Sequence, residues 1–247
     1  MAGRPAAGER GRRGRAYTLI TPENHYVSRL PSLPGARLVK LVTPRLAPAR
    51  LAQYLVDAPA AGADCRLEAD FEHFLFGLDG VAWVAGGDAR FDLSGEGFAY
   101  IPPGRQFTLR LEPDASLLWI KRRYEAWPGL SSPAALGGHA RAIEAVPTAV
   151  PGLTRRELLP PDDAAHDFNM SLMAFAPGVA LHQIEIHDEE HGLYLTSGDG
   201  LYRLDEDAHP VQAGDFVYMA PYCPQGFRAG PSGAEYLLYK DVYRDGF

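Results

Sequence analysis

Three of the eight histidines of this 247-residue chain, His182, His187 and His191, fall within ten residues, and Glu185 lies between the first two. On an extended strand alternate side chains share a face, so Glu185 and His187 point to one side and His182 to the other. After a turn over residues 188–190, His191 opens the next strand and can return to the face of Glu185. A carboxylate and two imidazoles at this spacing predict a metal site on adjacent strands.

A repeat within the chain shows which of these residues the fold itself requires. Three segments recur in order at an offset of 118 or 119 residues: Glu72–Phe76 with Glu190–Tyr194, Phe98–Pro103 with Phe216–Pro221, and Leu117–Lys121 with Tyr236–Lys240. Two copies of one module are therefore present. At the first offset Glu185 and His187 fall on Leu67 and Ala69, and only His191 keeps a counterpart, His73. A requirement of the fold would appear in both copies, so we assign the metal to the second copy alone.

The elements that position this site are short strands. Apolar runs are cut at close intervals by Gly, Pro and Asp, as in residues 71–93 and 191–221, where GLDG, AGGDA, SGDG and DEDA are the expected turns. Helical periodicity is weak, with short candidates near 48–55 and at the end of the linker. We predict an all-β fold, a sandwich or barrel class, with these domains: a disordered basic tail (1–14), a first barrel (15–125), a linker (126–150) and a metal-binding barrel (151–247).

Composition excludes several functional classes. The net charge of −7 and the absence of a basic stripe in the body of the chain argue against a nucleic-acid partner. No apolar run approaches the length of a membrane-spanning helix. Cys65 and Cys223 form no disulfide framework and are expected to be buried thiols. The first fifteen residues hold five arginines without a following apolar region, so we expect a cytoplasmic protein rather than a secreted one.

The repeated module resembles a cupin, and the whole chain resembles a bicupin, two jelly-roll β-barrels in tandem. The first cupin motif has the pattern His-x-His, then three or four residues, Glu, six residues and Gly. This chain matches it with Glu185-x-His187-x3-His191-x6-Gly198, in which the outer ligand types are exchanged. In the second motif Gln225 takes the place of the final histidine. The corresponding residue of the first copy is Phe107, which cannot bind a metal. The resemblance therefore implies a metal-free first barrel.

The exchanged ligand set, in a chain that ends with LLYKD, is similar to the (S)-ureidoglycine aminohydrolase family of purine and allantoin catabolism. The matching text includes DFNM, FAPG, EHG, GLYRL, VQAGD, MAP and YLLYKDV. The resemblance implies a homo-oligomer that hydrolyses a small ureide with Mn²⁺. Its implied metal ligands are Glu185, His187, His191 and Gln225, and its implied catalytic residues are Glu185 and Lys240. Implied substrate contacts are Glu185, Gln225, Tyr202, Tyr236 and Lys240.

The residues themselves leave alternatives open. The mixed nitrogen and oxygen ligands permit Fe²⁺, Co²⁺, Ni²⁺ or Zn²⁺ as well as Mn²⁺. Tyr202 and Tyr236 lie on apolar strands and would otherwise be interpreted as core residues, and Lys240 as a surface ion-pair partner of Asp241. Asn169 alternates with apolar neighbours and is a weaker candidate for the cavity wall. Two other functions compete: a metal-dependent dioxygenase or isomerase, and a non-catalytic bicupin that binds a ligand.

Overall fold

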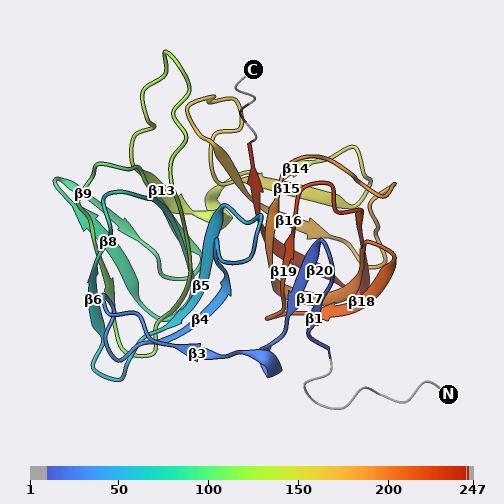
Figure 1. The fold of residues 1–247 in the computed structure, drawn as a ribbon, viewed down its shortest axis with the longest axis horizontal. Helices are drawn as coiled ribbons and strands as arrows, with labels where there is room; N and C mark the ends of the chain where they lie inside the picture. Colours follow the sequence, from blue (N-terminus) through green and yellow to red (C-terminus); the bar gives the residue numbers. More distant parts are fainter. Residues whose placement is uncertain (1–9, 243, 245–247) are drawn as a thin grey trace. The chain divides into compact units, whose positions relative to one another are not determined.

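The computed structural model describes residues 10–242 and 244, and they form two compact units whose regular secondary structure is almost entirely strand (Figure 1). The N-terminal unit comprises residues 26–143 and 162–167. The C-terminal unit comprises the described residues of 10–25, 144–161 and 168–244. The helices among the described residues are two short 3₁₀ turns, η1 (Pro22–Asn24) and η2 (Ala140–Ala142), and none of them is long or apolar enough to cross a membrane. The predicted all-β fold class is confirmed.

The N-terminal unit consists of two antiparallel sheets. Seven strands follow the order β13-β10-β7-β12-β5-β4-β3, and four more follow the order β6-β11-β8-β9. Their bounds are β3 Val27–Ser28, β4 Arg37–Val42, β5 Leu51–Asp57, β6 Ala63–Arg66, β7 Glu72–Asp79, β8 Ala82–Gly86, β9 Ala89–Asp92, β10 Gly97–Ile101, β11 Thr108–Leu111, β12 Ser116–Arg122 and β13 Leu136–His139. Inward-facing residues of both sheets form one apolar core around Trp119 and Leu75.

In the C-terminal unit longer strands, β17 and β20 above all, join the corresponding strands into one nine-stranded sheet. Its sheet has the order β1-β2-β19-β17-β20-β16-β15-β14, and β18 pairs with the second half of β17. The bounds are β1 Arg12–Arg13, β2 Tyr17–Ile20, β14 Val146–Pro147, β15 Leu153–Glu157, β16 Phe168–Phe175, β17 His191–Leu204, β18 Asp207–Gln212, β19 Phe216–Met219 and β20 Gln225–Asp241. A separate apolar core, which includes Leu193, Tyr202 and Tyr236, fills this unit.

The two units share strand register as well as sequence. His73 on β7 pairs with Ile101 and Lys121, and His191 on β17 pairs with Met219 and Lys240. These are the residues that the repeat aligns, so the repeat found in the sequence is a repeat of the sheet.

A buried hydrogen bond also recurs. The Tyr100 hydroxyl donates to Glu72 at 2.8 Å, and the Tyr218 hydroxyl donates to Glu190 at 3.0 Å. Burial of a carboxylate requires such a partner, which explains why Glu and Tyr recur at the matched positions.

The domain boundaries differ from the expected ones at four places. Residues 162–167, which we assigned to the metal-binding barrel, belong to the N-terminal unit. Residues 15–25, which we assigned to the first barrel, belong to the C-terminal unit, because β2 pairs with β19. The tail was expected to be disordered over 1–14, but Arg12 and Arg13 pair with β2, and Arg10 contacts Asp215 at 2.6 Å; the rest of the tail, 1–9, lies outside the described residues. Part of the linker forms β13, which extends the N-terminal sheet beside β10. Unpaired sheet edges accept further strands, and the sequence did not reveal which edges were open.

Two local expectations were also wrong. The helical candidate at 48–55 is largely strand β5, because six of its seven residues are buried between neighbouring strands. The expected turn at SGDG is a bulge inside the continuous strand β17, with shifts in register between 198 and 200. Gly198 has a φ of +74°, a left-handed conformation that glycine adopts without strain. Cys65 and Cys223 are free and buried, as expected.

Candidate metal and substrate site

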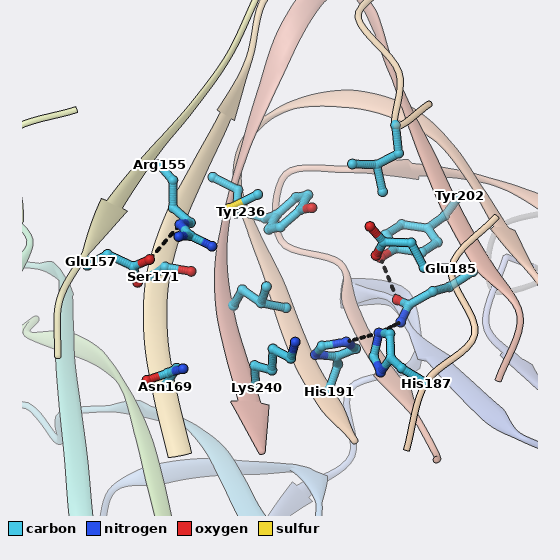
Figure 2. A pocket seen from close by; sticks show the side chains of 14 residues that line it. Arg155, Glu157, Asn169, Ser171, Glu185, His187, His191, Tyr202, Tyr236 and Lys240 are labelled. Carbon is cyan, nitrogen blue, oxygen red and sulfur yellow. Dashed lines mark hydrogen bonds and ion pairs between the residues drawn. The ribbon is translucent and has the colours of Figure 1, made fainter. Parts of the chain in front are cut away.

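A pocket of about 220 Å³ opens within the C-terminal unit, and it contains every candidate site residue that we named from the sequence (Figure 2). Its wall is built by strands β15, β16, β17 and β20 and by the segment before β17. The lining residues are Arg155, Glu157, Asn169, Ser171, Met173, Leu181, Glu185, His187, His191, Tyr202, Gln225, Tyr236, Leu238 and Lys240.

Glu185 and His187 lie on an extended segment rather than on a regular strand. Glu185 forms an isolated bridge with Gln225, in which the two residues exchange backbone hydrogen bonds of 2.8 and 3.0 Å. The alternation predicted for a strand still holds, since Ile184 and Ile186 are exposed while Glu185 and His187 face the pocket. His182 lines a different surface groove and is not part of the site.

Three polar side chains meet at one place in the pocket. Nε2 of His187 lies 3.1 Å from Nε2 of His191 and 3.0 Å from the amide nitrogen of Gln225 (Figure 2). An amide nitrogen only donates, so in this arrangement Nε2 of His187 is an acceptor and its proton sits on Nδ1. Burial, reinforced by nearby His187 and Lys240, lowers the pKa of His191 to about 3. Its imidazole is therefore neutral near pH 7, the form that binds a metal.

Glu189 connects the imidazoles to the lysine of the pocket. One carboxylate oxygen lies 2.9 Å from Nζ of Lys240, and the other lies 2.8 Å from Nδ1 of His187. The contact with His187 is close, although the ring N–H is not aligned with it as in a hydrogen bond. Burial raises the pKa of Glu189, but the Lys240 ammonium and His187 outweigh it, and the pKa is lowered overall. Glu189 is thus a carboxylate that holds two site residues in place.

Two tyrosines and Glu185 form the opposite part of the pocket (Figure 2). Tyr202 and Tyr236 are 2% and 3% exposed, which is the burial of core residues, yet both line the pocket. Burial raises the pKa of each phenol, and the negative charge of Glu185 raises it further, so both hydroxyls stay protonated as donors. The Tyr202 hydroxyl donates to Oε1 of Gln225 at 3.4 Å.

The donor set fits a divalent cation, with one side chain turned away. Among the residues that the structure describes, no three His, Cys, Asp or Glu side chains converge as metal ligands. Glu185 lines the same pocket as the two imidazoles, but its carboxylate lies beside the Tyr202 ring (Figure 2). A rotation of Glu185, with the Gln225 amide turned to present its oxygen, would be needed to give two nitrogens and two oxygens of the type that divalent cations such as Mn²⁺ accept.

On one wall of the pocket the sequence identified only Asn169. Arg155 and Glu157 on β15 form an ion pair at 2.5 Å, and Asn169 and Ser171 stand beside them on β16 (Figure 2). Each pair is separated by one residue, so the two members share a face of their strand. This period of two was visible in the sequence, but nothing marked which face was inward. Glu189 was assigned only to a turn.

The corresponding place in the N-terminal unit cannot bind a metal in the same way. His73 accepts a hydrogen bond from the Trp119 indole at Nδ1, 3.0 Å away, and its Nε2 contacts the carbonyl oxygen of Glu68 at 2.9 Å. Both ring nitrogens are thus satisfied within the protein. Leu67 and Phe107 are buried in the apolar core, and Ala69 offers no donor.

Solved structures of other proteins resemble this chain over most of its length. The structure resembles a putative glyoxylate-induced protein from Pseudomonas aeruginosa (TM-score 0.87, 27% identity, 99% of this chain and 95% of that one) and protein Ylba from Escherichia coli (TM-score 0.81, 29% identity, 95% and 96%). A cupin 2 conserved barrel domain protein from Leptotrichia buccalis shares the fold, with a TM-score of 0.63 at 15% identity over 91% of this chain and 96% of that one. The chain therefore has a fold of the cupin class.

Curated relatives define the family within that class. The chain is 34% identical over 233 residues to (S)-ureidoglycine aminohydrolase of Arabidopsis thaliana, which covers 94% of this chain and 77% of the relative. It is 32% identical over 237 residues to (S)-ureidoglycine aminohydrolase of Escherichia coli K12, over 93% of this chain and 89% of the relative. No family model matches the sequence. The chain belongs to the (S)-ureidoglycine aminohydrolase family.

Proposed function

We propose that this protein hydrolyses (S)-ureidoglycine to (S)-ureidoglycolate and ammonia in purine and allantoin catabolism, and that it depends on Mn²⁺. The observation that carries the proposal is the meeting of His187, His191 and Gln225 at 3.0–3.1 Å in the pocket that also holds Glu185 and Lys240. The relatives named for this reaction support the choice of substrate.

His187, His191, Gln225 and Glu185 would hold the cation. When bound, a divalent cation supplies Lewis acidity and a fixed point for a substrate that can chelate it. The neutral imidazole of His191 and the His187 proton on Nδ1 suit this role, and turning the Gln225 amide would release Nε2 of His187 from its present donor.

The substrate carries an amine, a ureido group and a carboxylate on one carbon. Lys240 offers the nearest ammonium for the substrate carboxylate, in competition with Glu189, its present partner at 2.9 Å. The protonated phenols of Tyr202 and Tyr236 are placed to donate to the ureido oxygen, and Gln225 lies beside Tyr202 at the same end of the pocket. These contacts fix which face of the carbon meets water.

Glu185 is the group that we assign to proton transfer. In the reaction the bond from carbon to the amine nitrogen breaks and a bond from carbon to the water oxygen forms. The Glu185 carboxylate accepts the proton that water loses and delivers it to the departing amine, which leaves as ammonia. Its position beside the phenols, on the backbone bridge to Gln225, keeps it within the pocket throughout.

The decisive experiment measures ammonia release and product chirality with ureidoglycine formed in situ from allantoate, with and without Mn²⁺. We expect metal-dependent formation of (S)-ureidoglycolate that is lost in Glu185→Ala and is reduced at subsaturating substrate in Lys240→Ala. Glu206→Ala, which removes an exposed carboxylate from the turn after β17, is the matched control and keeps the activity. Bound metal without acceleration over spontaneous decay would contradict the proposal, and oxygen consumption would redirect it to dioxygenase chemistry.

We further propose a cytoplasmic homo-oligomer. The two free, buried cysteines support a reducing compartment. Light scattering of the purified protein tests the assembly, and a monomeric mass at working concentration would contradict it.

A further inference from the structure

The two units keep a lysine at the same place and surround it differently. Lys121 pairs with His73 across β12 and β7, as Lys240 pairs with His191 across β20 and β17. The residue two positions before each histidine contacts the lysine: Glu189 by an ion pair at 2.9 Å in the C-terminal unit, and the Phe71 ring, 4.6 Å from Nζ, in the N-terminal unit. Each lysine thus has a carboxylate partner, Glu189 for Lys240 and Glu68 for Lys121, but only Lys121 also lies over an aromatic ring.

A cavity of about 400 Å³ lies around this lysine in the N-terminal unit. Its apolar wall includes Tyr54, Ala52 and the Phe71 ring. Tyr54 and Ala52 take the positions that Ser171 and Asn169 hold in the metal pocket, because the pairs Trp119–Tyr54 and Lys121–Ala52 correspond to Leu238–Ser171 and Lys240–Asn169 in register. Polar groups of one pocket are thus replaced by apolar and aromatic groups in the other.

The rim of this cavity carries cations, most of which have carboxylate partners. Arg50 pairs with Glu125, Lys121 pairs with Glu68, and the buried Arg122 contacts Asp167 at 3.3 Å.

Arg123 is different. It is exposed, its guanidinium lies 4.8 Å from the centre of the Phe71 ring, and it makes no ion pair with any residue in the described part of the chain. Two cations, Lys121 and Arg123, thus contact one ring at the mouth of an apolar cavity.

We propose that this cavity is a second ligand site, for a small aromatic carboxylate, and that it acts without a metal. The ring of such a ligand packs against Tyr54 and Phe71, and its carboxylate is bound by Arg123, whose planar fork of donors matches a carboxylate, together with Lys121. His73 is hydrogen-bonded within the core, and among the described residues no group of His, Cys, Asp or Glu side chains converges here as metal ligands. This site would add ligand binding to the proposed reaction, and the proposal of the site does not depend on that reaction.

Calorimetric titration of the full-length protein with benzoate tests this site, with benzamide as the neutral ligand of the same shape. We expect saturable binding of one benzoate per chain and at least tenfold weaker binding of benzamide, since a hydrogen bond to a charged group contributes that much. Arg123→Gln should weaken benzoate binding by a similar factor. Arg90→Gln is the matched control, because Arg90 also stacks on an aromatic ring, 4.4 Å from the centre of Trp83, but lies outside the cavity.

Two further variants decide between this site and the metal pocket. Phe71→Glu places a carboxylate beside Lys121, as in the C-terminal unit, and is expected to abolish benzoate binding. Lys240→Gln alters only the metal pocket and should leave benzoate binding unchanged. The proposal is overturned if the wild type does not bind benzoate, if benzamide binds equally well, or if binding is lost in Lys240→Gln and kept in Arg123→Gln. Circular dichroism and the thermal midpoint verify that each variant is folded. If a cavity variant does not fold, Lys121→Met is tested in its place.

Discussion

Oε1 of Glu189 lies 2.9 Å from Nζ of Lys240, while its second oxygen lies 2.8 Å from Nδ1 of His187. One carboxylate therefore contacts both a proposed metal ligand and the proposed anchor of the substrate carboxylate. A carboxylate behind a ligating histidine fixes the ring and its proton, which strengthens the metal site. The same group sets the position of the lysine before substrate arrives.

Glu189→Gln is expected to lower metal affinity or kcat/KM by about 10- to 100-fold, the usual effect of losing a group that supports a metal ligand. The neutral amide keeps the size of the side chain but loses its charge toward Lys240 and His187. Calorimetry with Mn²⁺ and steady-state ammonia release measure the two quantities. Glu206→Gln, in an exposed turn, should match the wild type. Unchanged Mn²⁺ affinity and unchanged kcat/KM in Glu189→Gln would contradict the supporting role.

Lys240→Gln is expected to raise KM more than it lowers kcat. A charge-assisted hydrogen bond to the substrate carboxylate contributes about 1.5 to 3 kcal/mol, which corresponds to about a 10- to 150-fold rise in KM. The side chain is 38% exposed and lies on the pocket wall, so its replacement should leave the fold intact. Steady-state kinetics over a wide range of substrate concentration test this. A KM equal to that of the wild type would show that another group binds the carboxylate.

Short apolar runs cut by turn residues made the all-β class predictable, and the internal repeat aligned His191 and Lys240 with His73 and Lys121, which pair in the same way. Period-two alternation placed Glu185 and His187 together on the pocket side, even though their segment is not a regular strand. Alternation of this kind is a local rule, because it needs only the neighbouring residues.

Features that depend on distant strands were not predictable. The pairing of β2 with β19 joins residues about 200 positions apart, and no local pattern indicates it. The inward face of β15, with Arg155 and Glu157, depends on which strand covers it. Glu189 was visible as a turn residue, but its contact with Lys240 exists only after β17 and β20 pair.

Gly198→Ala is expected to destabilise the C-terminal unit far more than Gly178→Ala does. Both glycines have a positive φ, +74° and +73°, which costs a residue with a side chain roughly 1 to 2 kcal/mol. A Cβ at Gly198 would also lie 2.1 Å from the carbonyl oxygen of Gly233, whereas a Cβ at Gly178 meets nothing within 4 Å. Backbone cannot move aside cheaply, so the total for Gly198→Ala should reach about 3 kcal/mol or more. Equal shifts of the thermal midpoint in the two variants would show that the β17 bulge adapts.

His73 should make the protein less stable in mild acid. Burial lowers the pKa of this imidazole from 6.5 to about 4, although its contact with the Glu68 carbonyl acts in the opposite direction. Between these two pH values the unfolded chain binds a proton at His73 that the folded chain does not, so stability falls as pH falls from about 6.5 to 4. The full loss from this one group is about 3 kcal/mol.

Denaturant unfolding at pH 7, 5.5 and 4 tests this prediction through the slope of stability against pH. His73→Gln keeps an acceptor for the Trp119 indole, which donates to Nδ1 at 3.0 Å, but removes the titrating group. The free energy of unfolding of this variant should therefore change less with pH than that of the wild type, whatever its absolute value. His182→Gln is the control, since His182 is exposed and its loss should leave the slope unchanged. A wild-type slope in His73→Gln would mean that other groups, such as the buried His191, account for the acid sensitivity.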